Sequence, residues 1–377
     1  MHICDLTTLY IDGGEGGVNT YLMEKARYLA DCADVRRHTI IVPGAHDTRR
    51  SLFGSTLYTL RSPRFFYNPH HRVLTRYAEI KRLLTLLKPD VVEVDCCYVL
   101  GQWAVAAMGP RRVPLVGFYH THLPSLYARP LTRHFGHTVA HMIESGARRY
   151  IAYCLKPLDK VLVASQAMYE QVVKHTDKQV AHVSLGVNLD LFAPQPQRCK
   201  PPYGHRPTVL YVGRLSQEKD LDILFEAFTL LNRQGQYQLQ IVGDGPLRPQ
   251  TERFVQSTPH TLYAGLIPYG IRLAEIYAAA DVLALPSRNE TFGLTMLEAL
   301  ASGLPVVAVN QGGPATLLQP WVGALATPGD PVDFAAKLAQ ILSDKPPAHS
   351  CRSYVAQHFS WYTTFDQLLG IYQSLLN

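Results

Sequence analysis

Short apolar runs alternate with longer stretches of helical spacing along most of this chain. The short runs predict strands at residues 1–6, 38–43, 91–94, 113–119, 160–164, 180–185, 208–212, 237–242, 262–264, 282–286 and 305–309. Apolar residues at helical spacing predict helices at 21–29, 73–87, 221–232, 272–280, 294–302, 332–342 and 359–376. Strands that alternate with helices form parallel crossover units, so the pattern predicts doubly wound α/β sheets.

The alternation stops between residues 188 and 207, where five prolines crowd a short polar stretch. Such a stretch is typical of a linker between domains. The 377 residues of the chain also exceed what one hydrophobic core usually holds. We therefore predict two Rossmann-like α/β domains that face each other across a cleft. The first covers residues 1–196 and is joined by a C-terminal helix at 358–377, and the second covers 197–357.

Basic residues are distributed unevenly between the two halves. Residues 1–196 hold 23 Lys and Arg against 16 Asp and Glu, a net charge of +7. Residues 197–377 hold 13 against 14, a net charge of −1. This asymmetry indicates that the first half meets an anionic partner: a nucleic acid, a phosphate-bearing substrate or a membrane surface. The overall composition, 47% apolar and 18% charged, excludes a disordered or collagen-like protein.

The cysteines and the amino-terminal residues indicate the cellular compartment of the protein. Seven cysteines show no C-x2-C spacing, which favours free thiols in a reducing compartment over zinc ligands or disulfides. The first residues carry no basic segment followed by a long apolar one, as a secretory signal would. We therefore expect a cytoplasmic protein.

Four loops of the second half follow predicted strands. They are 213–219 (GRLSQEK), 243–246 (GDGP), 290–298 (ETFGLTMLE) and 310–314 (NQGGP). Because the carboxyl ends of parallel strands meet at one edge of a sheet, these loops are expected to converge on one ligand site.

The residue types in these loops suit a phosphorylated ligand. Arg214 and Lys219 are able to clamp a diphosphate, Arg as a fork and Lys as a point charge. Gly293 removes a side chain just before a helix whose first N–H groups favour phosphate. Glu290 and Glu298 stand in an otherwise apolar segment, which indicates that they face a ligand cleft. The alternative is a surface helix with two solvated glutamates.

With these motifs in this order, the chain resembles retaining glycosyltransferases of family 4, which have the two-Rossmann-domain architecture called GT-B. The resemblance runs nearly end to end and rests on EGGVNTYL, KPDVVEV, YHTHLP, SLGVNLDLFAP, YVGRLSQEKDLD, IVGDGPL, NETFGLTMLEALASGLPVVA and the closing FSWYTTFDQLLGIYQSLL. The most specific of these is the E-x7-E element between Glu290 and Glu298. The resemblance implies transfer of a sugar from a UDP- or GDP-linked donor with retention of configuration, by front-face attack of the acceptor hydroxyl.

The resemblance also implies a role for each candidate residue. Glu290 would contact hydroxyls of the donor sugar, and Glu298 would hold the ribose hydroxyls. Arg214 and Lys219 would neutralise the diphosphate, where fixed cations stabilise the charge that forms as the anomeric bond breaks. The catalytic set is then His120, Arg214, Lys219 and Glu290, and the further donor-binding residues are Gly16, Gly17, Gly243, Phe292, Gly293, Leu294 and Glu298.

Two patterns raise the question of a metal ion. His120 and His122 form H-x-H, upstream of three histidines at helical spacing, His134, His137 and His141. Asp220 and Asp222 form D-x-D, but they stand at a helix start, where acids serve as caps. The family works without a metal, so we expect no metal and no cofactor. The chain departs from the family after Gly312-Gly313, where an acid is common and Pro314-Ala315-Thr316 stands instead.

The basic first half suggests what the acceptor is. Between Arg61 and Lys88 seven basic residues face only Glu79, with aromatic residues interleaved and a basic amphipathic helix expected from near His71. A second basic group consists of Arg129, Arg133, Arg148 and Arg149. Basic and aromatic residues together favour an anionic membrane surface, although a solvated face is the alternative. The segment YHTHLPSLY also resembles family members that glycosylate lipids, which implies a lipid or lipid-linked acceptor at the inner face of a membrane.

Other functions remain open at this stage. An acceptor that is soluble or a polysaccharide fits the same motifs, and so does a sugar-nucleotide epimerase of the same fold, although the E-x7-E element and the GRLSQEK loop argue against an epimerase. A basic nucleic-acid-binding protein is the non-enzyme alternative. No zinc knuckle, helix-turn-helix or aromatic RNP pattern supports it, so no nucleic-acid partner is expected. The sequence leaves the oligomeric state undefined.

Overall fold

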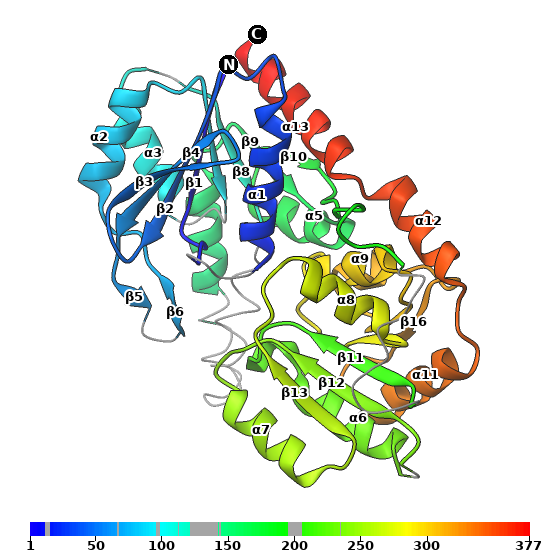
Figure 1. Ribbon diagram of the computed structural model, residues 1–377. Coiled ribbons are helices and arrows are strands. Elements are labelled where there is room, and N and C mark those ends of the chain that lie inside the picture. The colour runs from blue at the N-terminus through cyan, green and yellow to red at the C-terminus, as the bar shows by residue number, and fades with distance from the viewer. Residues whose placement is uncertain are drawn as a thin grey trace. The chain divides into compact units, whose positions relative to one another are not determined.

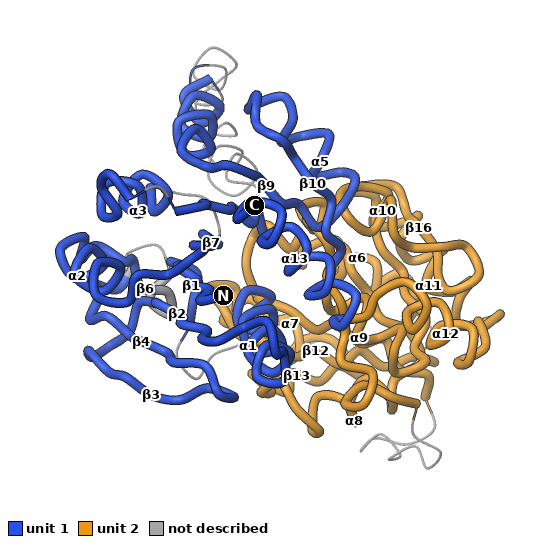
Figure 2. Tube along the Cα trace, turned by 90° about the horizontal axis from the view of Figure 1, so that it is seen from above, with its two compact units in different colours: residues 1–184, 361–377 blue, residues 185–360 orange. Residues whose placement is uncertain are grey.

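The computed structural model describes residues 1–11, 16–65, 68–95, 99–111, 113–120, 142, 145–194, 206–233 and 235–377. The chain divides into two compact units, each described here by itself (Figure 2). Unit 1 consists of Met1–Ser184 and Trp361–Asn377, and unit 2 of Leu185–Ser360. Residues 188–194, the first part of the predicted linker, therefore belong to unit 2, and residues 195–205 lie outside the described part of the chain.

Unit 1 is built on an eight-stranded sheet with the order β10-β9-β8-β7-β1-β2-β4-β3 (Figure 1). The strands are β1 (His2–Thr7), β2 (Arg37–Gly44), β3 (Thr48–Leu52), β4 (Ser55–Arg61), β7 (Val91–Asp95), β8 (Leu115–Phe118), β9 (Lys160–Val163) and β10 (Gln179–His182). All pairs are parallel except β3 with β4. The chain leaves β1 toward β2 and returns to its other side as β7, so the carboxyl ends of β1 and β7 form a topological switch point, where such sheets bind ligands.

Helices cover this sheet at places that local sequence explains. They are α1 (Gly17–Ala30), α2 (Tyr77–Leu87), α3 (Leu100–Met108), α5 (Gln166–Val172) with the short η2 (Val173–His175), a helical stretch at 145–155, and α13 (Trp361–Leu376). Helix α2 ends at Lys88, which takes a left-handed conformation with φ 48° before Pro89, because a helix cannot continue into a proline. Helix α13 returns from the end of the chain to pack on α1, where Phe365 contacts the rings of Tyr21 and Tyr28 (Figure 1).

Unit 2 contains a six-stranded parallel sheet with the order β13-β12-β11-β14-β15-β16. The strands are β11 (Thr208–Val212), β12 (Gln238–Val242), β13 (Thr261–Gly265), β14 (Val282–Leu285), β15 (Val306–Val309) and β16 (Gly323–Ala326). Between and after them lie η3 (Gln217–Lys219), α6 (Leu221–Leu231), α7 (Arg248–Ser257), α8 (Ile271–Ala279), α9 (Leu294–Ala301), α10 (Gly313–Leu317), α11 (Pro331–Ser343) and α12 (Ala348–His358). The two sheets confirm the predicted α/β fold class of two Rossmann-like domains.

The expected basic helix from near His71 was wrong at its start. Residues 68–72 form strand β6 (Asn68–Arg72), which pairs antiparallel with β5 (Arg64–Phe65), and the helix begins only at Tyr77. The hairpin between β5 and β6 holds this segment extended, which removes it from the helix that its side-chain spacing favoured.

No helix within the described ranges is long and apolar enough to cross a membrane.

Candidate active site

In unit 2 the loop after β11 and the loop after β12 interlock through glycines. The amide of Gly213 donates to the carbonyl of Val242 at 3.0 Å, and that of Leu215 donates to the carbonyl of Asp244 at 3.0 Å. Gly243 has φ 136°, and a Cβ on it would lie 1.9 Å from the carbonyl oxygen of Gly213. Only glycine tolerates both this conformation and this approach. The backbone that carries Arg214 is therefore fixed by the loop that contains Gly243.

A second interlock joins the loops after β14 and β15. Gly313 donates its amide hydrogen to the carbonyl of Glu290 at 2.8 Å. Gly312 has φ 71°, and a Cβ there would lie 2.3 Å from that same carbonyl oxygen. The glycine pair that the sequence placed after a strand thus supports the backbone of Glu290. This contact explains why glycines stand there without any reference to a ligand.

Two of the predicted catalytic side chains meet each other within unit 2. Lys219 Nζ donates to Glu290 Oε1, and the two side chains are 22% and 14% exposed. The pair joins the short helix η3, which follows β11, to the loop after β14. A cation and a carboxylate are thus brought to the carboxyl edge of the sheet, where the topology of unit 2 switches between β11 and β14.

The loop that carries Lys219 is also anchored by residues that sequence reasoning missed. Arg288 donates from Nε to Asp220 Oδ2 at 3.0 Å and from Nη2 to Asp220 Oδ1 at 2.5 Å. The Ser287 hydroxyl donates to the carbonyl of Glu218 at 2.9 Å. Both contacts tie η3 to the loop that leads from β14 to Glu290. In the sequence, Asp220 directly follows Lys219 and Arg288 lies two residues before Glu290. Charged residues beside a motif are common in loops, so this proximity did not identify the contact.

The expectation that Asp220 acts as a helix cap was wrong. Asp220 is the N-cap residue of α6, but its side chain accepts no hydrogen bond from the first turn of that helix. It accepts the amide and the guanidinium of Arg288 instead. Its left-handed backbone, φ 48°, turns the carboxylate toward the β14 loop, so a long-range fork replaces the local cap.

Arg214 is the most exposed of the predicted catalytic side chains. Its side chain is 43% exposed, and Nη1 lies 3.6 Å from Glu218 Oε1. The hydroxyl of Tyr211 donates to the carbonyl of Arg214 at 2.9 Å. Burial, with Glu290 nearby, raises the pKa of Tyr211 well above its ordinary value, so this phenol remains a donor across the physiological range. The backbone of Arg214 is therefore held while its guanidinium faces solvent.

The E-x7-E element spans the start of helix α9. Gly293 precedes the helix with φ 98°, and no side chain caps its first turn, which leaves the first N–H groups of α9 without a side-chain cap. Helix N-termini of this kind attract phosphate. Glu298 lies one and a half turns into α9 with its side chain mostly buried, and it accepts a hydrogen bond from the Tyr277 hydroxyl at 2.8 Å. Phe292 is buried beside Phe359, with 6.1 Å between ring centroids.

In unit 1 the candidate residues lie near the switch point between β1 and β7. Gly16 and Gly17 are exposed at the amino end of α1. His120 follows β8, and its side chain is only 6% exposed. Burial lowers the pKa of His120 to about 4, so its imidazole is neutral near pH 7. His120 Nε2 lies 3.0 Å from Asp95 Oδ1, at the carboxyl end of β7.

A buried charged cluster lies under this site and was not foreseen. Lys25 Nζ of α1 donates to Asp5 Oδ1 at 2.7 Å and to Glu93 Oε1 at 2.8 Å, and all three side chains are fully buried. The hydroxyl of Tyr372, from α13, donates to Glu93 and lies 2.9 Å from Lys25 Nζ. The residues are far apart in the sequence, so no local pattern marks them as partners.

Several predicted residues lie outside the described part of the chain. They are His122, Arg129, Arg133, His134, His137 and His141. Within the ranges that are described, no group of three His, Cys, Asp or Glu side chains is placed to hold a metal ion.

Comparison with known families assigns each half of the chain. The family described as Glycosyltransferase Family 4 matches residues 15–191, and the family described as Glycosyl transferases group 1 matches residues 197–358.

Individual relatives extend over most of the chain. A GDP-mannose-dependent alpha-(1-6)-phosphatidylinositol dimannoside mannosyltransferase of Mycobacterium tuberculosis is 30% identical, over 90% of this chain and 88% of its own length. The sulfoquinovosyl transferase of Arabidopsis thaliana is 27% identical over 89% of this chain, which spans 65% of that relative's length. Among solved structures, sucrose-phosphate synthase of Thermosynechococcus elongatus has a TM-score of 0.82 with 22% identity, covering 100% of this chain and 99% of its own. This last likeness shows a shared fold and confirms the GT-B expectation.

Proposed function

Because the chain belongs to glycosyltransferase family 4, we propose that it transfers a sugar from a nucleoside-diphosphate sugar to a hydroxyl of a lipid or lipid-linked acceptor, with retention of configuration. The donor is UDP- or GDP-linked. The observation that carries this proposal is the meeting of Lys219 and Glu290 beside the open N-terminus of α9, on loops that are fixed to each other. A cation, a carboxylate and helix amides together suit a sugar joined to a diphosphate.

In this proposal the residues of unit 2 divide the donor between them. Glu290 accepts hydrogen bonds from sugar hydroxyls, and Glu298, oriented by Tyr277, accepts those of the ribose. Lys219, Arg214 and the first amides of α9 face the diphosphate. As the bond between the anomeric carbon and the phosphate oxygen breaks, negative charge grows on the diphosphate, and these fixed positive groups stabilise it. The acceptor oxygen attacks from the same face, and its proton passes to the departing phosphate oxygen.

The names of the relatives support an acceptor of the glycolipid type. The mannosyltransferase relative acts, by its name, on phosphatidylinositol dimannoside and uses GDP-mannose, and the plant relative is a sulfoquinovosyl transferase. We extend to this chain only the class that the first name implies: a nucleotide sugar as donor and a lipid headgroup as acceptor. The direct test is turnover, measured as release of nucleoside diphosphate, with UDP- and GDP-sugars and with vesicles that contain phosphatidylinositol or diacylglycerol. A protein that hydrolyses or transfers none of these donors would contradict the proposal.

The fork between Arg288 and Asp220 yields a prediction about donor turnover. Arg288→Ala should lower kcat/KM by about 10–100-fold, because the loop of Lys219 then loses its tie to the loop of Glu290, and misplacements on the order of 1 Å are costly in an active site. Arg253→Ala is the matched control, because this arginine of unit 2 is exposed on α7. The measurement is kcat/KM of both variants from steady-state kinetics. Equal values would show that the contact between Arg288 and Asp220 does not support the site.

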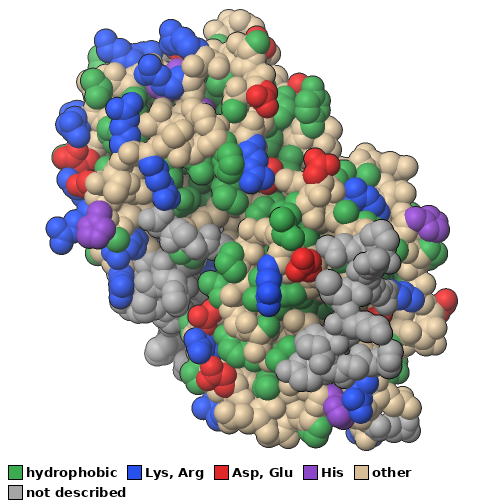
Figure 3. Space-filling model, viewed as in Figure 1, with side chains coloured by type: hydrophobic (Ala, Val, Ile, Leu, Met, Phe, Trp, Pro, Cys, Tyr) green, Lys and Arg blue, Asp and Glu red, His purple; other side chains and the backbone are tan. Residues whose placement is uncertain are grey.

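We place the membrane contact on the second basic group and not on the first. Lys and Arg side chains gather over the part of unit 1 that holds α2 and β3 (Figure 3). Several of them are already engaged: Arg76 pairs with Asp47 at 2.6 Å, and Arg82 with Glu79 at 2.9 Å. Arg72 donates to the carbonyl of Ser62 at 2.6 Å. The carboxylates of Asp47 and Glu79 reduce the charge that the segment offers to a membrane, and the Ser62 carbonyl holds the guanidinium of Arg72 against the protein.

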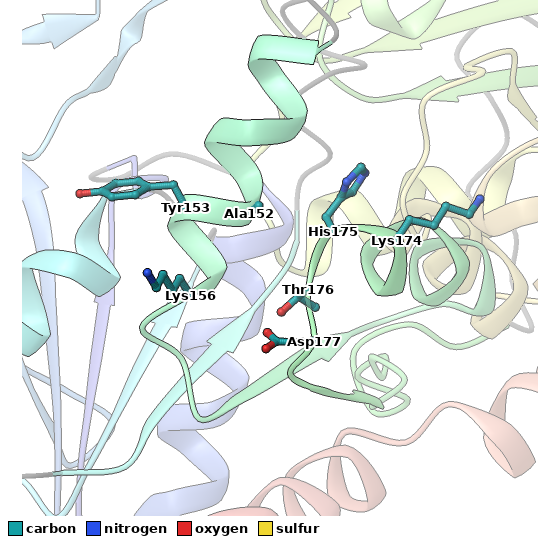
Figure 4. A pocket seen from close by; sticks show the side chains of 7 residues that line it. All are labelled: Ala152, Tyr153, Lys156, Lys174, His175, Thr176 and Asp177. Atoms are coloured by element: carbon teal, nitrogen blue, oxygen red, sulfur yellow. The ribbon is translucent and has the colours of Figure 1, made fainter.

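The second basic surface combines cations with exposed aromatic rings. Arg148 and Arg149 are exposed on the helical stretch at 145–155, where Tyr150 and Tyr153 are 42% and 52% exposed. This surface continues into an open groove, lined by Tyr153 from the helical stretch, Lys156 just after it and Lys174 from η2 (Figure 4). Tyrosine beside lysine and arginine is the composition typical of the interface of an anionic bilayer.

Vesicle binding tests this surface. Replacing Arg148, Arg149, Lys156 and Lys174 by Gln should weaken co-sedimentation with phosphatidylglycerol vesicles by about 10-fold or more at low salt, because each surface charge adds to the attraction. The matched variant, with Arg72, Arg76, Lys81 and Arg82 replaced by Gln, should weaken it less. Added salt should reduce binding of the wild-type protein. Binding that neither salt nor either variant changes would contradict an electrostatic membrane contact.

A further inference from the structure

His120 is held from several sides at the switch point of unit 1. Its ring stacks on that of Phe118, with 4.2 Å between centroids and 7° between planes. The ring of Tyr21 lies against it at 5.0 Å, and the hydroxyl of Tyr21 donates to Glu93 Oε1 at 2.7 Å. Glu93 in turn accepts from Lys25. The imidazole is therefore fixed in position. What remains to be determined is which ring nitrogen carries the proton.

Asp95 is the residue that determines the tautomer of His120. Its Oδ1 lies 3.0 Å from His120 Nε2, and its side chain is fully buried. Within the described residues, Asp95 Oδ2 is buried and has no hydrogen-bond partner. A buried carboxylate with one oxygen unpaired is costly, whereas a protonated carboxyl in the same place costs much less. The geometry alone thus favours a carboxyl group that donates through Oδ1.

The charges around the site point the same way. The titratable groups around His120 come from two strands and two helices, and they are Asp5, Glu93, Asp95, Lys25, Tyr21 and Tyr372. Lys25 is the one cation of this set, and it balances one of the three carboxyls. Although burial opposes ionisation, Lys25 and His38 hold the pKa of Asp5 below its ordinary value. Burial raises the pKa of Asp95 well above its ordinary value and Asp5 adds to this effect, and together they outweigh Lys25 and Glu93, which lower it.

We propose that Asp95 is a positioning residue that donates a hydrogen bond to His120 Nε2 and so fixes the imidazole as its Nδ1–H tautomer. The inference rests on the glycosyltransferase activity proposed above, for which His120 belongs to the predicted catalytic set. In this tautomer Nδ1 is a hydrogen-bond donor and is unable to act as a base. His120 then serves the reaction by donating to a sugar or acceptor oxygen, which matches a front-face mechanism in which the phosphate takes the proton.

Two substitutions at one position separate this role from a general need for a carboxylate. In Asp95→Asn the side-chain amide is able to donate to Nε2 as the carboxyl does, so the Nδ1–H tautomer survives and kcat should stay within about threefold of the wild type. In Asp95→Ala the donor is lost, and kcat should fall by about 10–100-fold, the equivalent of one active-site hydrogen bond. The affinity for UDP or GDP should not change in either variant, because Asp95 is not among the predicted donor-binding residues.

The tautomer itself gives a readout that does not depend on turnover. Two-bond ¹⁵N–¹H correlation spectra of protein labelled at histidine nitrogen distinguish Nδ1–H from Nε2–H, and His120→Gln identifies the signal. We expect Nδ1–H in the wild type and in Asp95→Asn, and a mixture in Asp95→Ala. Asp90→Asn is the control, since Asp90 stands before the other end of β7 and accepts from the amide of His2 at 2.7 Å. It should leave both kcat and the His120 signal unchanged.

Three results would contradict the role proposed for Asp95. A wild-type ring protonated at Nε2, an Asp95→Asn variant as slow as Asp95→Ala, or an Asp95→Ala variant with the wild-type kcat would each overturn the proposal. If Asp95→Ala does not fold, the wild type and Asp95→Asn still decide it through the spectra. If the wild-type protein transfers sugar from no nucleotide donor, the proposed function fails. The spectra then still test the contact between Asp95 and His120 by itself.

Discussion

Lys219→Ala and Glu290→Ala should each lower kcat for sugar transfer by about 10²–10³-fold or more while both units remain folded. The reason differs between the two residues. Lys219 stabilises charge that appears on the diphosphate only as the anomeric bond breaks, so its loss raises the barrier more than it weakens donor binding. Glu290 orients the sugar, and its loss lets the reacting carbon leave its aligned position. The measurement is single-turnover transfer at saturating donor.

The ion pair between these residues allows a sharper version of the experiment. Each single variant leaves its partner as an unpaired, mostly buried charge, so each should also be less stable than the wild type. The double variant Lys219→Ala/Glu290→Ala removes both charges, so its stability should recover relative to the singles while its kcat stays low. A double-mutant cycle in urea unfolding and in kcat therefore separates the structural pairing from catalysis.

A lysine elsewhere in unit 2 provides the control for this cycle. Lys337 lies on α11, away from the loops of the site, and Lys337→Ala should retain the wild-type kcat and stability. If Lys219→Ala or Glu290→Ala kept the wild-type kcat, the donor site would have to be sought elsewhere. If the double variant recovered activity together with stability, the pair would be a structural contact only.

Most of the second unit was predictable because its strands are short and continuously apolar. In a parallel sheet such runs are buried on both faces, and the loops that follow them share one edge, so the meeting of the Lys219 and Glu290 loops followed from the sequence alone. In unit 1 the strands β3, β4, β5 and β6 were missed, and in unit 2 the strand β16. Strand β16 consists of the small residues GALA, which form no apolar run, and the antiparallel pairing of β3 with β4 depends on a turn at Phe53-Gly54.

The supporting contacts of the site could not be predicted from the sequence, for a different reason. The partnership of Arg288 with Asp220 joins residues 68 positions apart, and that of Lys25 with Tyr372 joins residues 347 apart. Propensity and periodicity describe neighbours within a turn or a strand, and they contain no term for such pairs. Asp220 shows the consequence: at a helix start, local rules assign an acid to the cap, but the distant guanidinium provides more hydrogen bonds than the helix end.

Lys25→Met should produce the largest loss of stability of any single substitution considered. Lys25 is fully buried between Asp5 and Glu93, so its removal leaves two carboxyls in the core of unit 1 without their cation. Breaking a buried pair in this way typically costs about 3–5 kcal/mol, because the remaining charge is neither solvated nor compensated. Methionine keeps most of the volume of the side chain, so the loss reports charge and not a cavity. The measurement is urea unfolding at fixed pH, with Lys156→Met, an exposed lysine of the same unit, as the control.

The pH dependence gives this prediction its sign. In the wild type, despite the opposing effect of burial, Lys25 holds the pKa of Asp5 below its ordinary value, so that carboxylate stabilises the fold above the unfolded pKa of about 4. Burial already raises the pKa of Glu93 in the wild type although Lys25 opposes this. Without Lys25, burial would raise the pKa of Asp5 as well and that of Glu93 further. The folded variant would then hold protons that the unfolded chain has released, and its stability would fall as pH rises from about 4 toward 7. The gap between Lys25→Met and wild type should therefore be smaller at pH 5 than at pH 7. A gap that is constant between these pH values, or below about 1 kcal/mol at pH 7, would mean that the two carboxyls are not charged partners of Lys25 in the folded protein.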